Sequence, residues 1–178
     1  YKKEEGRIML ESMLRNGTIS QEFYDWLIDN GFKTAPASTK YHGACEGGLY
    51  EHSCEVAGQL LSLTACLDLQ WKRMESPMIV GMFHDLCKID AYKQLSFDGN
   101  LVNAWEHNDD VLLKGHGDKS VMLLSQFMTL TDEEILCIRY HMGAYETDNW
   151  KQFDLAIKKY PNVLFTHTAD MLASKLHT

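Results

Sequence analysis

The strongest constraint on this chain is an adjacent pair of residues, His84 and Asp85, at the end of an apolar run that closes with Phe83. Burying an imidazole beside a carboxylate costs free energy unless another group compensates both of them. A divalent cation compensates both, because it binds nitrogen and oxygen ligands together. His52 upstream and Asp170 far downstream offer further ligands of the same two kinds. The order of these four residues therefore indicates a metal site in a folded core.

Apolar residues recur with helical spacing along most of the chain, which predicts a mainly helical fold. Ser20 suits the N-cap of a short helix that stops at Asn30-Gly31, and the pattern over 49–67 predicts a long helix that faces the core. Ser76-Pro77 predicts another helix start, since Ser suits the cap and Pro is tolerated at the first helical position. We expect that helix to carry His84-Asp85 at its end.

One interruption of the helical pattern predicts a β-hairpin around the turn Asp98-Gly99-Asn100. The segment 33–48, with a proline and several glycines, predicts a loop that leads into His52. After the hairpin, Asp118 is expected to cap one helix and Thr131 to open another with a capping box. Pro161 then opens the last helix, which carries Asp170. The predicted fold class is all-α, a helical bundle with a small β-hairpin insertion.

Length and composition agree with one domain over 1–178, because 178 residues of which 45% are hydrophobic can bury one substantial core. The five cysteines are odd in number and show no C-x-x-C spacing, so we expect them to be reduced in a cytoplasmic protein. No apolar run approaches the roughly 18 to 20 residues that span a bilayer. A net charge of −8 argues against broad capture of duplex DNA or anionic membrane.

The four candidate ligands fit one ion only if several helices meet around it. Adjacent residues on a helix point about 100° apart, so His84 and Asp85 reach one ion only if it lies against the flank near the helix end. His52 and Asp170 have apolar neighbours on their own predicted helices, so both side chains should point inward. The set suits Mn, Mg or Fe and is workable for Zn, Co or Ni.

This order of His, then His-Asp, then Asp resembles the HD-domain phosphohydrolase family over about 41–175. The matching stretches are 47–53 (GGLYEHS), 84–88 (HDLCK), 115–120 (GHGDKS), 139–141 (RYH) and 167–172 (HTADML). The grouping around His116 is most similar to the HD domain of exoribonuclease-type and uncharacterised bacterial or phage members. The additional nucleic-acid-binding domain that such exonucleases carry is not part of this chain, which favours a free nucleotide or short oligonucleotide over long nucleic acid.

The resemblance implies that His52, His84, Asp85 and Asp170 are the ligands of a first metal. It implies that His116 and His141 either bind a second metal or contact the substrate phosphate, and the sequence leaves both alternatives open. Asp85 would bridge two ions or accept a proton from water. Lys88, one helical turn beyond His84, would neutralise a phosphate or pair with an acidic ligand. Catalytic roles are thus expected for Asp85, Lys88, His116 and His141.

The function implied is hydrolysis of a phosphoester of a nucleotide or related small phosphorylated molecule, with one or two divalent ions activating water. One alternative is a phosphodiesterase or exonuclease acting on cyclic or short oligonucleotides. Another is a non-catalytic sensor that has kept the metal cage. Neither oligomeric state nor metal identity follows from the sequence.

Other conspicuous side chains have ordinary structural interpretations. His42 is equally suited to a pocket wall or to the surface, His107 to a solvent-exposed turn, and His167 to supporting Asp170. Aromatic residues in and around the hairpin offer a nucleobase-stacking face, but packing is the commoner explanation and the one we favour. They are Tyr92, Phe97 and Trp105.

Overall fold

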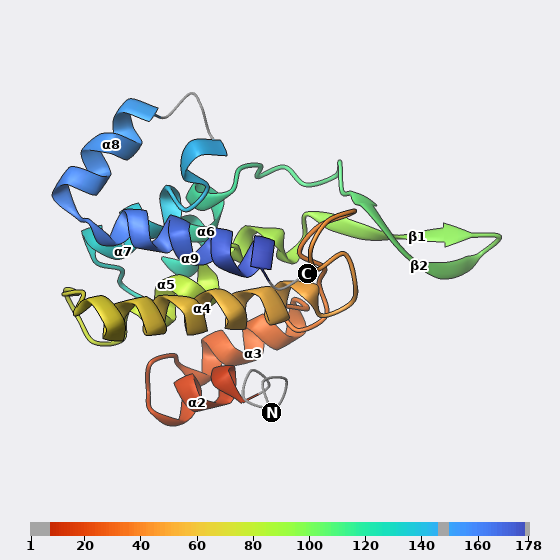
Figure 1. Cartoon of the computed structure of the whole chain (residues 1–178). Helices are drawn as coiled ribbons and strands as arrows, with labels where there is room; N and C mark the ends of the chain where they lie inside the picture. Colours follow the sequence, from red (N-terminus) through yellow and green to blue (C-terminus); the bar gives the residue numbers. More distant parts are fainter. Residues whose placement is uncertain (1–7, 146–149, 177–178) are drawn as a thin grey trace.

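The structure is a computed structural model that describes residues 8–145 and 150–176. Helices make up most of it, and two strands form a small antiparallel sheet (Figure 1). The α-helices are α2 (Met9–Arg15), α3 (Gln21–Asp29), α4 (Gly48–Leu67), α5 (Ser76–Phe83), α6 (Gly117–Leu124), α7 (Asp132–Arg139), α8 (Trp150–Lys159) and α9 (Asn162–Leu176). Two short 3₁₀ helices, η1 (Leu86–Ile89) and η2 (Gly143–Tyr145), and strands β1 (Tyr92–Phe97) and β2 (Asn100–His107) complete the described elements. The predicted helical fold with a hairpin is confirmed at this level.

The long helix α4 lies at the centre of the helical body and packs against α5 on one side and α9 on another (Figure 1). Its buried face contributes Val56 and Leu60, which meet Phe83 of α5 and Val163 of α9 in one apolar cluster. Helix α7 packs against α9, α6 and α5. Two helices, the adjacent α5 and the distant α9, thus pack along α4, which is the arrangement that the four predicted ligands require.

Several predicted helix ends are confirmed in detail. The Ser20 side chain accepts a hydrogen bond from the Phe23 amide at the start of α3, and Asn30 follows its last residue. At the start of α7, Thr131 and Glu134 form the reciprocal capping box. These caps satisfy amides that have no partner inside the helix. All five cysteines are free thiols.

Two predicted caps are wrong, each because the side chain bonds elsewhere. Ser76 is the first residue of α5 rather than its cap, and its hydroxyl donates to the buried carboxylate of Glu134 over 2.8 Å. Asp118 lies in the first turn of α6 instead of before it, and its carboxylate pairs with Arg139 of α7. In both places a tertiary partner competes with local capping.

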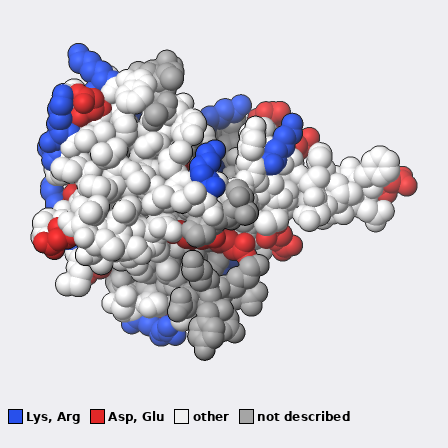
Figure 2. All heavy atoms as spheres, in the orientation of Figure 1, with Lys and Arg blue, Asp and Glu red and all other residues white. Residues whose placement is uncertain are grey.

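The hairpin projects away from the helical body (Figure 1). Asp98 and Gly99 both have positive φ, at 52° and 77°, as the tight turn between β1 and β2 requires. Phe97 beside this turn is 78% exposed, so the packing expected for it is wrong. Mostly uncharged side chains cover the visible face of the hairpin (Figure 2). Within the described part of the chain, none of the helices combines the length and hydrophobicity needed to cross a membrane.

Candidate metal centre

His52 lies in the second turn of α4 and is 3% exposed. Its position opposite α5 depends on a close helix approach one and a half turns further along. A Cβ atom added to Gly81 of α5 would lie 2.4 Å from the Cα atom of Ala57 of α4. Only two small residues allow backbones to come this close. The pair therefore sets the spacing that brings the imidazole of His52 to the end of α5.

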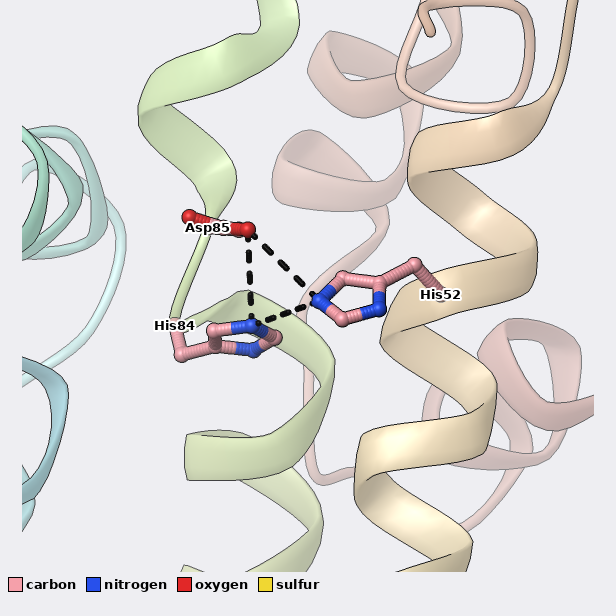
Figure 3. Close-up of side chains that lie close together, drawn as sticks. All are labelled: His52, His84 and Asp85. Carbon is pink, nitrogen blue, oxygen red and sulfur yellow. Dashed lines mark hydrogen bonds and ion pairs between the residues drawn. The ribbon is translucent and has the colours of Figure 1, made fainter. Parts of the chain in front are cut away.

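His84 and Asp85 lie at the end of α5, but the expectation that both belong to this helix is wrong. The helix ends at Phe83, His84 is its C-cap, and Asp85 adopts a non-helical φ of −104° and ψ of 20°. The departure from helical geometry lets both side chains turn toward His52, as Figure 3 shows. The Nδ1 atom of His84 hydrogen bonds with the carbonyl of Gly81 over 2.9 Å, which directs Nε2 toward the cluster.

Asp170 comes to the same point from α9, which packs along α4. Its Oδ1 atom lies 3.2 Å from Nε2 of His52 and 3.9 Å from Nε2 of His84. The hydroxyl of Ser174 donates to the same oxygen over 3.2 Å. The described polar partners of Asp170 are therefore two imidazoles and one hydroxyl.

Four ligand atoms converge on one small volume. Nε2 of His52 lies 3.2 Å from Nε2 of His84 and 3.7 Å from Oδ2 of Asp85, and the last two atoms are 3.5 Å apart. An ion with bonds of about 2.1 Å holds neighbouring ligand atoms about 3.0 to 3.4 Å apart in octahedral or tetrahedral shells. The distances between the two imidazoles and from each imidazole to the two carboxylates, 3.2 to 3.9 Å, are close to that range. The two imidazoles could therefore hold a divalent ion with Asp85, and with Asp170 as well once the carboxylates adjust around it.

His141 extends this cluster from another element. It follows the end of α7 in a turn, is fully buried, and directs Nε2 toward Oδ1 of Asp85 at 3.3 Å. Its Nδ1 atom hydrogen bonds with the carbonyl of Ile138 over 2.7 Å. The rings of His84 and His141 meet edge to face with centroids 4.9 Å apart. Asp85 thus faces two groups, with Oδ2 toward His52 and His84 and Oδ1 toward His141.

His116 is exposed and occupies the N-cap position of α6. It can place a ring nitrogen within 4.8 Å of ligand atoms of Asp85 and Cys87. The sequence argument did not consider Cys87 as a ligand, although its place two residues after Asp85 could have suggested it. Burial raises the pKa of the Cys87 thiol to about 12, which works against the thiolate form that metals bind. Of Asp85, Cys87 and His116, the carboxylate and the imidazole are therefore better suited than the thiol to bind a metal ion.

Lys88 supplies the positive charge nearest to the cluster. Its ammonium lies 2.5 Å from Oδ2 of Asp85. Burial would raise the pKa of the Asp85 carboxyl, but Lys88, His84 and His141 together hold it well below its usual range. Burial lowers the pKa of His84 to about 4, so this imidazole is neutral and able to coordinate at physiological pH. The Asp85 carboxylate is thus beside a neutral imidazole at His84, whereas its hydrogen bonding and charge outweigh burial and raise the pKa of His141.

Some buried atoms of the cluster have no hydrogen-bond partner among the described residues. They are Nδ1 of His52, Oδ1 of Asp85 and Nε2 of His141. Buried polar atoms are rarely left unpaired, and the last two face each other at 3.3 Å without hydrogen-bond geometry. Either a proton held between them or a cation bound by both would satisfy the two atoms, and the pKa of His141 is raised by Asp85 in keeping with the first. This part of the cluster therefore accommodates a positive charge.

The other histidines of the described residues lie outside the cluster. The Nε2 atom of His42 pairs with Glu55 at 3.3 Å, and its ring lies edge to face with that of His52 at 5.8 Å, so it borders the site. His107 is exposed, as expected, but it is the last residue of β2 rather than part of a turn, because it pairs with Tyr92 of β1. His167 hydrogen bonds with the backbone of His141.

Comparisons with protein-family models, with curated proteins and with solved structures find no match for this chain. The case for the centre therefore rests on its own geometry.

Proposed function

We propose that this chain is an HD-type metal-dependent phosphohydrolase that cleaves a phosphoester of a nucleotide or related small phosphorylated molecule. The single observation that carries the proposal is the convergence of two carboxylates, Asp85 and Asp170, on the imidazoles of His52 and His84, with carboxylate oxygens 3.2 to 3.9 Å from the imidazole nitrogens. Three separate helical regions supply them, so chance adjacency in sequence does not explain the cluster. The donor set of two imidazoles and two carboxylates fits a divalent ion.

A divalent ion bound here would supply a water molecule of lowered pKa and a Lewis acid for a phosphoryl oxygen. The protein's own residues supply the rest. Asp85 stays ionised because Lys88 and neighbouring imidazoles stabilise its charge, so its carboxylate is deprotonated and able to bind a cation. Lys88 is 16% exposed in its side chain and can turn its ammonium toward a phosphate oxygen that arrives beside Asp85.

A binuclear phosphodiesterase is the second candidate, and a specific observation favours it. Oδ1 of Asp85 faces away from His52 and toward His141, and His116 lies within reach of the same carboxylate. A carboxylate with one oxygen for each of two ligand groups suits a bridge between two ions. In that arrangement His116 and His141 hold a second ion, and cyclic or short oligonucleotides become suitable substrates.

Elemental analysis of the purified protein tests the metal centre. We would compare the metal-to-chain ratio of the unaltered protein with that of the variant carrying His116→Ala and His141→Ala, after loading with Mn²⁺. If the unaltered protein binds nearly two ions per chain and the double variant binds one, the result supports the binuclear phosphodiesterase. One ion in both proteins assigns the two histidines to substrate. No bound metal in either protein refutes the proposal.

Hydrolysis is tested with the isosteric variant Asp85→Asn, which removes the charge but keeps the shape. Turnover of nucleoside phosphates and cyclic nucleotides should fall at least about 100-fold if Asp85 acts as base or ligand. Asp154→Asn is the matched control, because Asp154 lies on α8 with its side chain 58% exposed. A metal-loaded wild-type protein that binds nucleotides but never releases phosphate would instead identify the non-catalytic sensor.

A further inference from the structure

The base of the hairpin carries an aromatic face beside the candidate centre. Tyr92 of β1 is directly opposite His107 of β2, and Gln94 is opposite Trp105. Residues two apart on a strand point to the same side, so these four side chains share one face. The rings of Tyr92 and His107 have centroids 5.3 Å apart. The face therefore presents two aromatic rings and an imidazole in a row.

The opposite face of the same strands has a different character. Lys93 and Glu106 are opposite each other there, form an ion pair at 3.5 Å, and are each about half exposed. This is the usual chemistry of a solvated strand face. Because the two faces differ within the same few residues, the aromatic side is not explained by strand propensity alone.

Contacts with the helical body fix the base of the hairpin. The Asn108 amide donates to the carbonyl of Ala91 over 2.9 Å, and its side-chain amide donates to the carbonyl of Asp90 over 3.0 Å. The buried ammonium of Lys119 in α6 pairs with the Asp90 carboxylate. Only the distal part of the hairpin projects freely (Figure 1). Tyr92, next to Ala91, is thus held in place relative to the centre.

Tyr92 is also electrostatically close to the centre. It follows Lys88 by four residues, at the point where η1 gives way to β1. Burial raises the pKa of Tyr92, and the charges of Lys88 and Asp85 act on its hydroxyl in opposite directions. The Tyr92 ring, which begins the aromatic face, is therefore close to the Lys88 ammonium, which we expect to meet the phosphate.

Trp105 adds a polar atom that lacks a partner. Its side chain is partly exposed, yet the indole N–H is shielded from solvent and has no acceptor among the described residues. A shielded donor without an acceptor is costly, and a ligand reaches this one only when the partly exposed indole turns toward the open side of the face. A planar ring with acceptor atoms at its edge would then satisfy it.

We propose that the face formed by Tyr92, Trp105 and His107 binds the nucleobase of the substrate, while Lys88 and the metal centre hold its phosphate. This inference rests on the proposed function and specifies its substrate class as a nucleotide rather than a phosphorylated sugar or a simple phosphoester. Stacking on aromatic side chains is sequence-tolerant, so all four common bases should bind. The hairpin therefore determines specificity and takes no part in cleavage.

Calorimetric titration in the presence of Mn²⁺ tests this with two kinds of ligand that differ in the base. The four ribonucleoside 5′-monophosphates carry a base, and ribose 5-phosphate has the same phosphate without one. The unaltered protein should bind the nucleotides at least about tenfold more tightly, which corresponds to about 1.4 kcal/mol. In the variant carrying Tyr92→Ala and Trp105→Ala this ratio should fall to near one, with metal content unchanged. Phe97→Ala, which removes an exposed ring near the turn, should leave it unchanged.

A second measurement avoids dependence on the folding of the double variant. The indole N–H signal of Trp105 in a ¹⁵N–¹H spectrum, assigned with Trp105→Phe, should shift on addition of a nucleotide and not on addition of ribose 5-phosphate. The proposal is overturned if the indole signal does not shift with nucleotide, or if the affinity ratio is unchanged in the double variant. It is also overturned if the unaltered protein binds the two kinds of ligand equally or binds neither.

Phosphate release measured in the same samples separates this inference from the proposed function. Base-dependent binding without phosphate release supports the aromatic site and refutes the hydrolase. Equal release from both kinds of ligand, unaffected by the double substitution, supports the hydrolase and refutes the aromatic site.

Discussion

The imidazole of His167 donates from Nδ1 to the backbone carbonyl of His141 over 2.8 Å. His167 lies on α9 one helical turn before Asp170, so this bond joins the helix that carries one candidate ligand to the turn that carries another. We expected His167 to support Asp170, and the hydrogen bond shows that its partner is the backbone of His141 instead. Its role is to hold two parts of the cluster at a fixed separation.

Gly143→Ala should disturb this link. A Cβ atom there would lie 2.7 Å from Cγ and Nδ1 of His167, and Gly143 has a φ of +51°. Strain and clash together should lower the free energy of unfolding by about 2 to 3 kcal/mol. We also expect weaker Mn²⁺ binding, because displacing His167 frees the turn of His141. Urea denaturation with and without Mn²⁺ measures both effects.

Gly17→Ala is the matched control for that substitution. Gly17 has a φ of +79° with nothing within 4 Å of an added Cβ, so it carries the backbone strain without the clash. It should cost about 1 kcal/mol and leave Mn²⁺ affinity unchanged. If the two substitutions have equal effects on both quantities, the contact with His167 does not hold the turn in place.

Gly81→Ala should force α4 and α5 apart, because the added carbon would lie within 3 Å of the backbone and Cβ of Ala57. Overpacking of this kind costs about 1 to 3 kcal/mol. The Nε2 atoms of His52 and His84, now 3.2 Å apart, should separate, and Mn²⁺ affinity should drop by at least about tenfold. Thermal unfolding and metal titration of the variant measure the two effects.

The control for this prediction is Gly58→Ala on α4. An added Cβ at Gly58 meets nothing within 4 Å, so alanine should stabilise the helix by about 0.5 to 1 kcal/mol and leave the metal site intact. A Gly81→Ala protein that binds Mn²⁺ as tightly as this control would show that helix spacing does not set the ligand geometry.

Sequence patterns predicted the parts of the fold in which local chemistry decides the outcome. Ser20, the Thr131 capping box and the Asp98-Gly99 turn form where expected, because each is determined by a few adjacent residues. Ser76 was misplaced because its hydroxyl bonds to Glu134, which is 58 residues away. Contacts of this length are invisible to a local pattern.

In the candidate site, too, the sequence predicted some features and missed those that depend on distant contacts. Residue types and their order were enough to predict that His52, His84, Asp85 and Asp170 form one site. The structure places their side chains in one cluster. The sequence could not show that α5 ends before His84, because neither a glycine nor a proline follows Phe83 to mark the helix end. Nor could it place Cys87 near His116, since that proximity depends on how α6 packs against η1.

Glu134→Gln should be among the more destabilising single changes outside the site. The carboxylate is fully buried and accepts hydrogen bonds from Arg73, Ser76 and the Thr131 amide, which tie the start of α5 to the start of α7. Removing its charge leaves the guanidinium without a counter-charge and should cost about 3 kcal/mol. Asp132→Asn, an exposed neighbour on the same helix, should change stability by less than about 0.5 kcal/mol. Urea denaturation at neutral pH compares the two, and equal midpoints would show that the buried network contributes nothing.

The same carboxylate predicts how stability changes with pH. Burial would raise the pKa of Glu134, but its bonds to Arg73, Thr131 and Ser76 together hold it below the ordinary value of 4.5. The unfolded chain therefore binds a proton at a higher pH than the folded one does. The stabilisation is complete above pH 4.5 and is lost as the pH falls through the lower folded value.

Unfolding free energies of the unaltered protein and of Glu134→Gln should accordingly converge as the pH is lowered from 6 toward 3. Asp85 and Asp170 also have lowered pKa values, but both proteins contain them, so their contribution cancels in the difference. Urea denaturation at several pH values measures that difference directly. A gap that stays constant over this range would mean that the charge of Glu134 is not the source of its stabilising effect.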